Sequence, residues 1–424
     1  MTQGESGYQG GALGTTTRRR FLKDAAGLAV TASALAASEA RENASPPRPV
    51  LAYVGTYSSP QGPEGAKGRG QGIYLMEMNP ATGVLKQREV FPNDANPACL
   101  AFDPSRTHLY SANEVSGFQG TSSGSVNAYA IDRGTGRLTL LNVVSSEGAG
   151  GPAHLSIHPS GKFALAANYK GGTVTVLPIR ANGELGPATD VIENQGTVGP
   201  DHATSGPKGS FAISGHDHPH AHMIQSDPAG RFVFSPDLGL DRIFTWQFDA
   251  DKGKLIPNDP PSVVLPPGDG PRHFTFHPNG RWFYSVQEEA STLVTYDYDA
   301  KNGRLTPKQT VSTLPKGFVG TNYTSGLMTS ADGKVLYAAN RLHDSIAWFT
   351  IDPATGTLTF AGEEWTRGDY PRTFNIDPSG NFLYSCNQRA DNITTFRVNR
   401  RTGALTFTGQ YTPVGTAAMI IFLI

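Results

Sequence analysis

The sequence predicts an all-β fold, a seven-bladed β-propeller that forms one domain from residue 46 to residue 424. Three observations lead to it: a Gly-x-Leu turn that recurs about every fifty residues, a second repeat of hairpins with Pro-x-Gly turns, and terminal strands that complete each other. The composition agrees, because 49 Gly and 31 Pro beside many Val, Thr, Tyr and Phe residues are typical of short strands and tight turns. A period near fifty built in this way is typical of propeller blades.

The Gly-x-Leu turn occurs seven times and so predicts seven blades. The turns begin at Gly83, Gly136, Gly183, Gly253, Gly303, Gly356 and Gly403. The interval from Gly183 to Gly253 is the longest, at 70 residues, and the extra length indicates an insertion.

Six hairpins share an apolar strand, a turn related to Asp/His-Pro-x-Gly, and a second apolar strand. They begin at Phe102, Ile157, Ser226, Phe276, Thr329 and Ile376. Proline fixes φ and glycine tolerates positive φ, so the pattern predicts a tight turn. A seventh copy is divided between the termini: 51–57 resembles the second strand and 417–424 the first. We therefore expect the last strand to pair beside the first and close the ring, which removes exposed sheet edges.

Residues 1–45 are predicted to be an export signal and leader rather than part of the fold. Thr17-Arg18-Arg19-Arg20-Phe21-Leu22-Lys23 precedes an Ala-rich apolar stretch and resembles a twin-arginine export signal. Small residues around Ala34, Ala36 and Ala40 offer a cleavage site, which would place the protein in the periplasm or outside the cell. A basic disordered leader and an uncleaved anchor are the alternatives.

Charge and cysteine usage restrict the partners. The net charge is −1, so no global field favours nucleic acid or a membrane surface. No apolar run is long enough to span a bilayer, and we expect no membrane span in the mature chain. The two cysteines, Cys99 and Cys386, fall in different repeats, which favours two buried thiols over a disulfide.

Counting from the turn proline, or from Ala331 in the one hairpin that lacks it, separates repeated positions from variable ones. The ninth residue after it is polar in every hairpin: Asn113, Asn168, Asp237, Gln287, Asn340 and Asn387. We interpret this recurring side chain as a structural device that bonds the next loop. The tenth residue changes from blade to blade: Glu114, Tyr169, Leu238, Glu288, Arg341 and Gln388. Variation at a fixed position marks what the scaffold displays.

The sixth residue before the turn proline also varies, and it lies at the start of the strand expected to line the channel. These residues are Ala98, Ala153, His222, Arg272, Ser325 and Arg372. Because the strands of a hairpin are antiparallel, both variable positions reach the same rim. The count therefore predicts that His222, Arg272, Glu288, Arg341 and Arg372 converge at one mouth of the channel, as in a small-molecule site.

The insertion is Gly/Ser/Pro-rich and spans 194–222, so it is predicted to be a loop. His216, His218, His220 and His222 alternate, which in an extended chain would place all four on one face. A metal site that includes His202 is one interpretation, but no complete ligand set is evident beyond Asp201 and Asp217. We predict no metal or other cofactor and favour a catalytic role for one or two of these histidines. His154, His158, His273 and His277 are expected to be mostly structural, although His154, beside the Ala153 position, is also a candidate for substrate binding.

Several motifs resemble the seven-bladed lactonase family, which includes bacterial propeller-type 6-phosphogluconolactonase and fungal carboxy-cis,cis-muconate cyclase. They are GPRHFTFHPNG from Gly270, YSVQE ending at Glu288, YAANR ending at Arg341, YPRTFNIDPSG from Tyr370, and PHAH before Met223. The resemblance covers residues 50–424. It implies a lactone hydrolase with a catalytic His, Arg, Glu and Arg, which here are His222, Arg272, Glu288 and Arg341. His220 competes with His222 for the first role.

The resemblance also implies how the chemistry would be divided. Glu288 would activate water, Arg272 and Arg341 would bind an anionic group or the oxyanion, and His222 would protonate the leaving ring oxygen. The predicted substrate-binding residues are His220, Arg372, His154 and Gln388. The partner expected is a small lactone or anionic sugar-like molecule, and the export signal favours an unphosphorylated one. A muconate-type cycloisomerase, a non-catalytic binding propeller and a purely structural Arg272–Glu288 pair are the alternatives.

Overall fold

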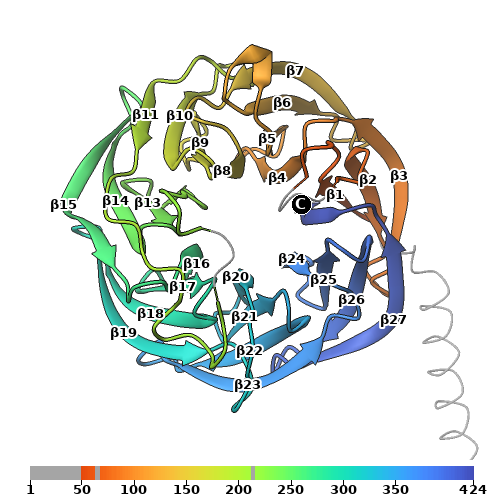
Figure 1. The fold of residues 1–424 in the computed structure, drawn as a ribbon. Helices are drawn as coiled ribbons and strands as arrows, with labels where there is room; N and C mark the ends of the chain where they lie inside the picture. Colours follow the sequence, from red (N-terminus) through yellow and green to blue (C-terminus); the bar gives the residue numbers. More distant parts are fainter. Residues whose placement is uncertain (1–48, 63–66, 212–214) are drawn as a thin grey trace, which may run out of the picture. The chain divides into compact units, whose positions relative to one another are not determined.

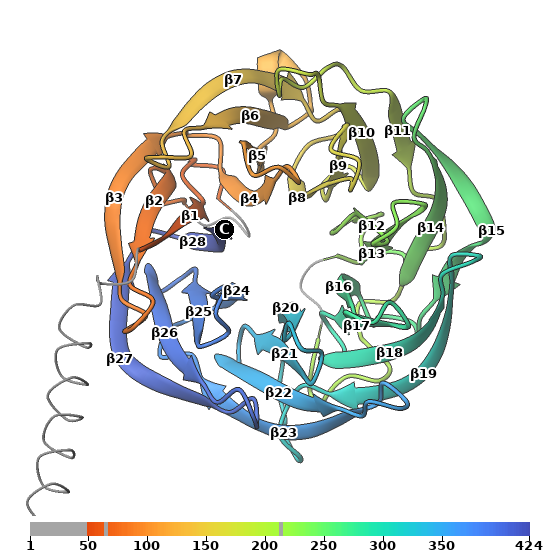
Figure 2. The same ribbon diagram turned by 180° about the vertical axis from the view of Figure 1, so that it is seen from behind.

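The computed structural model describes residues 49–62, 67–211 and 215–424. These residues form seven four-stranded antiparallel sheets arranged as blades around a central channel (Figures 1 and 2). The predicted seven-bladed propeller is confirmed. The export signal predicted in residues 1–45 lies outside the described residues. Within the described part, no helix is long and apolar enough to cross a membrane.

Each blade presents one strand to the channel and three successively further out. From blade 1 to blade 7, the innermost strands are β28 (Ala417–Leu423), β4 (Pro97–Phe102), β8 (Pro152–Ile157), β12 (Gln225–Ser226), β16 (Pro271–Phe276), β20 (Thr324–Thr329) and β24 (Pro371–Ile376). The second strands are β1 (Val50–Thr56), β5 (His108–Asn113), β9 (Phe163–Asn168), β13 (Phe232–Asp237), β17 (Trp282–Gln287), β21 (Val335–Asn340) and β25 (Phe382–Asn387).

The outer two strands of each blade are joined by the Gly-x-Leu turn. The third strands are β2 (Gly72–Met78), β6 (Ser125–Ile131), β10 (Thr173–Pro178), β14 (Arg242–Asp249), β18 (Thr292–Asp299), β22 (Ser345–Ile351) and β26 (Asn392–Val398). The outermost strands are β3 (Leu85–Pro92), β7 (Leu138–Ser145), β11 (Asp190–Glu193), β15 (Lys254–Val264), β19 (Arg304–Ser312), β23 (Leu358–Trp365) and β27 (Leu405–Pro413). A short 3₁₀ turn, η2 (Phe118–Gly120), lies between β5 and β6.

Blade 1 closes the ring as predicted. The C-terminal β28 pairs antiparallel with β1, with Leu51 opposite Leu423 and Val54 opposite Ile420. The closing blade therefore takes its inner strand from one end of the chain and its other three strands from the opposite end.

The hydrophobic core lies between neighbouring blades, because both faces of each inner sheet are covered. On β1, Ala52 and Val54 belong to a cluster shared with blade 7, whereas Tyr53 belongs to one shared with blade 2. The strands consequently have continuous apolar runs instead of the alternation of a half-exposed sheet. Cys99 and Cys386 are buried free thiols, as predicted.

The Gly-x-Leu turns also lock adjacent blades together. A tyrosine in the second strand donates its hydroxyl hydrogen to the carbonyl oxygen of the turn glycine in the next blade. The pairs are Tyr53–Gly136, Tyr110–Gly183, Tyr284–Gly356, Tyr337–Gly403 and Tyr384–Gly83, at 2.7–3.0 Å. Gly83 has φ +75°, and a Cβ there would lie 2.5 Å from the Phe382 ring, so only glycine fits.

The polar residue at the ninth register position is structural, as predicted. Asn113, Asn168, Asp237, Gln287, Asn340 and Asn387 are all buried. Asn168 Nδ2, for example, donates to the carbonyl oxygen of Ser146 and to the hydroxyls of Thr173 and Thr175. Asn340 and Asn387 likewise donate to the carbonyl oxygens of Thr313 and Thr366, so these side chains tie the end of the second strand to a loop of the same rim, whereas the Gln287 side chain bonds Ser285 of its own strand.

Candidate active site at the channel mouth

The variable positions meet at one end of the channel because of a repeated irregularity in the inner strands. In blade 5, Pro271 pairs with Gln287 but His273 pairs with Val286, so Arg272 is an unpaired bulge residue. Arg372 lies in the same kind of bulge in blade 7. A β-bulge re-aims the side chain of the extra residue, and here the residue enters the mouth of the channel. The sequence count located these residues but not the bulge that presents them.

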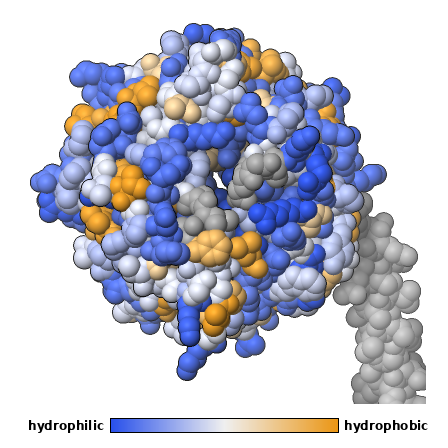
Figure 3. All heavy atoms as spheres, in the orientation of Figure 1, coloured by the Kyte–Doolittle hydropathy of each residue, from blue (hydrophilic) through white to orange (hydrophobic). Residues whose placement is uncertain are grey.

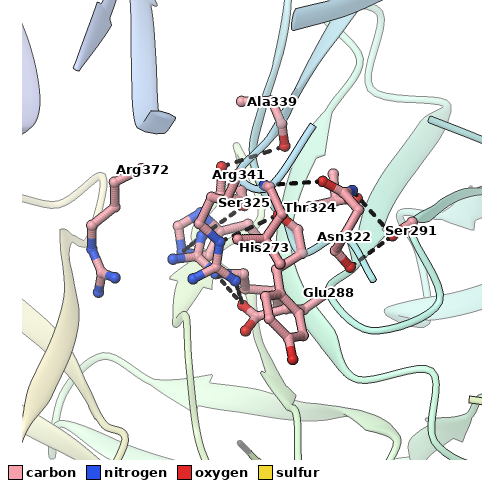
Figure 4. Close-up of polar contacts among 12 residues, drawn as sticks. His273, Glu288, Ser291, Asn322, Thr324, Ser325, Ala339, Arg341 and Arg372 are labelled. Atoms are coloured by element: carbon pink, nitrogen blue, oxygen red, sulfur yellow. Dashed lines mark hydrogen bonds and ion pairs between the residues drawn. The ribbon is translucent and has the colours of Figure 1, made fainter. Parts of the chain in front are cut away.

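Arg272, Glu288 and Arg341 form one buried ion cluster. Glu288 Oε2 lies 2.7 Å from Arg272 Nε and 2.5 Å from Arg341 Nη2. The three side chains are only 1%, 5% and 3% exposed. Figure 4 shows Arg341 converging on Glu288, with Arg372 set apart from them. The predicted facing of Arg272 and Glu288 across one hairpin is confirmed, and Arg341 joins them from the neighbouring blade.

Backbone and aromatic groups hold the two guanidinium groups in place. Arg272 Nη1 donates to the carbonyl oxygen of Ser325 at 2.6 Å. Arg341 donates to the Tyr323 carbonyl at 3.3 Å and to the Tyr370 hydroxyl at 3.2 Å, and it lies over both tyrosine rings. Burial and the nearby charge of Arg341 lower the pKa of Arg272 to about 10, against the opposing effect of Glu288. Arg272 therefore remains charged at neutral pH.

His222 is the histidine of the insertion that reaches this cluster. It is buried, and its ring packs edge-on against His273 at 5.0 Å and against Tyr169 at 5.4 Å between centroids. Burial, followed by the positive charge of Arg272 and further contributions from Arg372 and Arg341, lowers the pKa of His222 well below its usual value. The imidazole is consequently neutral at physiological pH. No group of the described residues hydrogen-bonds its Nδ1.

His154 and His273 continue the row of rings from His222. The His154 and His273 rings meet edge-on at 5.6 Å, and Ile224 N–H donates to His154 Nδ1 at 3.5 Å. Burial, with a smaller effect from the Arg272 charge, lowers the pKa of His154 to about 4 and that of His273 well below its usual value. A second neutral imidazole beside Arg272 therefore lies at the mouth. The sequence analysis treated His273 as mostly structural, but its contact with His222 places it in this site.

Arg372 forms a separate ion pair. Its Nη2 lies 3.2 Å from Glu114 Oε2, which also accepts the Tyr57 hydroxyl at 2.7 Å. The guanidinium carbon lies 4.9 Å from the centroid of the Tyr57 ring. This pair joins blades 2 and 7 across the closing blade. The neighbouring Gln388 is buried and donates its backbone N–H to the Tyr370 carbonyl.

His220 does not share the environment of His222, although only one residue separates them. Its ring stacks on Tyr169 at 4.2 Å, and its Nε2 lies 2.6 Å from Asp217 Oδ1. The geometry thus favours His222 over His220 as the histidine that acts with the arginines. The Tyr169 ring contacts both histidines, and His220 is paired with Asp217 of the insertion.

The expectation that four alternating histidines share one face is wrong. His216 is buried and faces Asp241 at 3.5 Å, His218 is part-exposed, and His222 lies in the channel. The reason is that this segment is not extended: it bends at Asp217 and His218, and it contains no strand before β12. His202 and Asp201 are both exposed.

Two tyrosines and a second acid were missed by the sequence analysis. Tyr323 and Tyr370 stand two residues before the Ser325 and Arg372 positions, as His220 stands before His222. A ring two residues before the variable position therefore recurs in blades 4, 6 and 7, and this recurrence could have revealed the tyrosines from the sequence. Glu289 is buried beside Glu288, and burial together with the Glu288 charge raises its pKa well above the usual range.

Figure 3 shows a small hollow near the centre of one face, with hydrophilic residues among those around it. Three guanidinium groups (Arg272, Arg341 and Arg372) face two carboxylates (Glu288 and Glu114) at this mouth. Neutral imidazoles and tyrosine rings complete the surroundings. A cationic site with a neutral base, sheltered from solvent, suits a reaction in which negative charge develops on a substrate oxygen.

Comparison with known proteins identifies the family. The model for the family described as lactonase, seven-bladed β-propeller, matches residues 51–422. The chain belongs to this family. The Bacillus subtilis 6-phosphogluconolactonase is 31% identical over 330 residues, which cover 78% of this chain and 85% of that protein. The 6-phosphogluconolactonase of Formosa agariphila is 30% identical over 331 residues, which cover 77% and 86%.

A solved structure extends the comparison to three dimensions. The Pseudomonas aeruginosa periplasmic gluconolactonase superposes with a TM-score of 0.77 at 30% identity, covering 88% of this chain and 99% of that one. The family resemblance predicted from the sequence motifs is confirmed, and with it the assignment of the protein as a lactone hydrolase. The channel mouth, where Arg272, Glu288 and Arg341 converge, is the candidate site for lactone hydrolysis.

Proposed function

We propose that this lactonase hydrolyses an uncharged sugar lactone of the gluconolactone type at the channel mouth, outside the cytoplasm. The observation that carries the proposal is the charge of the mouth. Arg272 and Arg341 share the single carboxylate of Glu288, so this cluster has more guanidinium than carboxylate charge, which suits the negative charge of a tetrahedral intermediate. A phosphorylated lactone would add about two more negative charges, which is more than the one excess positive charge of this cluster.

In the proposed mechanism, His222 is the general base. Its lowered pKa keeps the imidazole neutral, so it can take a proton from a water molecule as the water oxygen attacks the lactone carbonyl carbon. Arg272 and Arg341 donate hydrogen bonds to the carbonyl oxygen as it becomes negative. When the ring C–O bond breaks, the protonated His222 returns the proton to the departing ring oxygen. The products are the open hydroxy acid and the enzyme in its initial protonation state.

In this mechanism Glu288 positions the arginines instead of activating water. Its Oε2 is shared between Arg272 Nε and Arg341 Nη2, so it sets the separation of the two guanidinium groups. The orientation of these donors before substrate arrives is what makes electrostatic stabilisation effective. The role of base suggested by the sequence thus passes from Glu288 to His222.

Residues 1–45 support the location in this proposal. The Arg18-Arg19 pair followed by Phe21, Leu22 and Lys23 is typical of twin-arginine export, and one structural relative is a periplasmic gluconolactonase. In cell fractionation, Arg18→Lys/Arg19→Lys should retain the protein in the cytoplasm, while Arg20→Lys, at the variable position of the motif, is the control that likewise leaves the charge unchanged. Normal export of the double variant would contradict a twin-arginine route.

The substrate proposal is tested by comparing glucono-δ-lactone with its 6-phosphorylated form at pH 6.5, after subtraction of spontaneous hydrolysis. We expect kcat/KM to be at least about tenfold higher for the unphosphorylated lactone, since a tenfold ratio corresponds to about 1.4 kcal/mol. Arg272→Met is the control for site-dependent turnover and should abolish most of the activity toward either compound. A preference for the phosphorylated lactone would overturn the substrate assignment while leaving lactone hydrolysis intact.

A further inference from the structure

A second cluster of chemically active side chains lies in the insertion, outside the arginine cluster. Asp217, His218 and His220 each offer one ligating atom, and these atoms lie within 4.8 Å of one another. His220 Nε2 is 2.6 Å from Asp217 Oδ1, and His218 Nδ1 is 3.0 Å from Asp217 Oδ2. The reaction proposed above uses none of these atoms.

The tautomer of His220 follows from its other ring nitrogen. Its Nδ1 lies 3.0 Å from the backbone carbonyl oxygen of Tyr169. A carbonyl oxygen only accepts hydrogen bonds, so Nδ1 must carry the hydrogen. In the neutral ring, Nε2 then presents its lone pair, and that lone pair faces the Asp217 carboxylate. Stacking on the Tyr169 ring fixes this orientation.

The same reasoning applies to His218 with the nitrogens exchanged. Its Nε2 lies 3.0 Å from the backbone carbonyl oxygen of Lys170 and therefore carries the hydrogen. The lone pair of Nδ1 is left facing the second carboxylate oxygen of Asp217. Two imidazole lone pairs and a carboxylate thus point toward one another, and all three are acceptors.

Such an arrangement requires positive charge between its members, either as protons on both histidines or as a bound cation. Two protonated rings would lie 4.0 Å apart between centroids and share a single carboxylate, and like charges so close oppose each other's ionisation. A cation satisfies all three acceptors at once. Histidines that bind metals usually donate their other N–H to a carbonyl or carboxylate, as His218 and His220 do here.

We propose that Asp217, His218 and His220 bind a divalent metal ion of the zinc type. Two imidazole nitrogens and one carboxylate oxygen are a ligand set that Zn²⁺ accepts, with solvent completing the tetrahedron. The side chains of Asp217 and His218 are 73% and 43% exposed, so an ion can enter from solvent and the carboxylate can move to open the 2.6 Å contact. The buried His220 anchors the site.

Metal binding at this site is expected to fix the position of the insertion. Both ligating histidines are tied to carbonyls of the Tyr169–Lys170 turn in blade 3, and Tyr169 packs against His222. A metal ion at this point would hold the insertion against blade 3 and fix the wall behind His222. The site is proposed independently of which lactone is hydrolysed.

The test uses the full-length protein freed of any affinity tag and of metal by chelator dialysis. Zn²⁺ is titrated in competition with a chromogenic chelator, and Co²⁺ is added separately to record ligand-field absorption. We expect one equivalent of Zn²⁺ per chain, a Co²⁺ spectrum typical of four-coordination, and a higher melting temperature with Zn²⁺. His218→Gln and Asp217→Asn should each weaken Zn²⁺ binding at least about tenfold.

His343→Gln is the matched control, because His343 is also a part-exposed histidine with a nearby carboxylate, Glu363. It should bind Zn²⁺ as the wild type does. The metal-free melting temperature of His218→Gln should equal that of the wild type, which separates loss of a ligand from misfolding. The proposal is overturned by less than stoichiometric binding, by undiminished binding in both ligand variants, or by an equal loss in His343→Gln.

Discussion

Two guanidinium–carboxylate groupings stand at the same height in the channel but differ in charge and in what they join. Arg272, Glu288 and Arg341 form a nearly solvent-free cluster in which one carboxylate serves two cations, within blades 5 and 6. Arg372 and Glu114 form a one-to-one pair that is 9% and 14% exposed, and it bridges blades 7 and 2 across the closing blade. The first grouping has unbalanced charge available to a substrate, whereas the second is neutral and links the two ends of the ring. Arg272 and Arg372 occupy the same register position in different blades. Arg272 belongs to the cluster proposed to act in catalysis, whereas Arg372 links blades 7 and 2 across the closing blade.

The largest effect is expected from removing the inner strand of the closing blade, which lies between Arg372 and Glu114 in the ring. Deletion of residues 417–424 should abolish cooperative unfolding, because it removes the inner strand and buried side chains such as Ile420 and Phe422. Each large apolar side chain contributes about 1.5–3 kcal/mol, and the exposed edge of β1 would favour aggregation. Thermal unfolding by circular dichroism measures the effect. Removal of the exposed Ile424 alone should leave the transition unchanged, and a folded truncation to 416 would refute the closure argument.

On the catalytic side, His222→Gln should lower kcat by about 10²–10⁴, the usual contribution of general acid–base catalysis. A general base is active only when deprotonated, so activity is lost as the pH falls through its pKa. Because the pKa of His222 is well below 6.5, wild-type kcat/KM should stay level from pH 7.5 to below pH 6. A pH profile with a midpoint near 6.5 would contradict the assignment of His222 as the base. His220→Gln, two residues away, should keep most of the activity.

The sequence was sufficient where the interaction lies within one repeat, and insufficient where it depends on how blades pack. Blade number, ring closure and the facing of Arg272 and Glu288 all follow from turn spacing and hairpin register. The addition of Arg341 to Glu288, and the pairing of Arg372 with Glu114, depend on the angle between blades and on contacts 258 residues apart. The bulge at Arg272 has no sequence signature beyond the preceding proline, and the irregular backbone of the insertion defeated the count of alternating histidines.

Glu288→Gln tests whether this carboxylate mainly balances charge. It should destabilise the fold by about 3–5 kcal/mol, because it leaves two buried guanidinium groups without their shared anion. Adding Arg341→Met removes one of those cations and should restore part of the stability but not the activity, since both oxyanion donors are needed. Urea unfolding and lactone hydrolysis of the two single variants and the double variant complete the cycle. Additive losses of stability would show that Glu288 and Arg341 are not coupled.

The smallest effect is expected for the second grouping. Glu114→Gln removes a carboxylate that accepts from both Arg372 and the Tyr57 hydroxyl, so we expect a loss of about 1–3 kcal/mol of stability from the unsatisfied buried partners. Lactone kcat should fall less than about tenfold, because neither Glu114 nor Arg372 touches the oxyanion in the proposed mechanism. Arg372→Met should behave in the same way, while raising KM if the guanidinium contacts the sugar hydroxyls. If either substitution lowers kcat as strongly as Arg272→Met, the two sides of the mouth act as one catalytic unit, and the division between chemistry and closure is wrong.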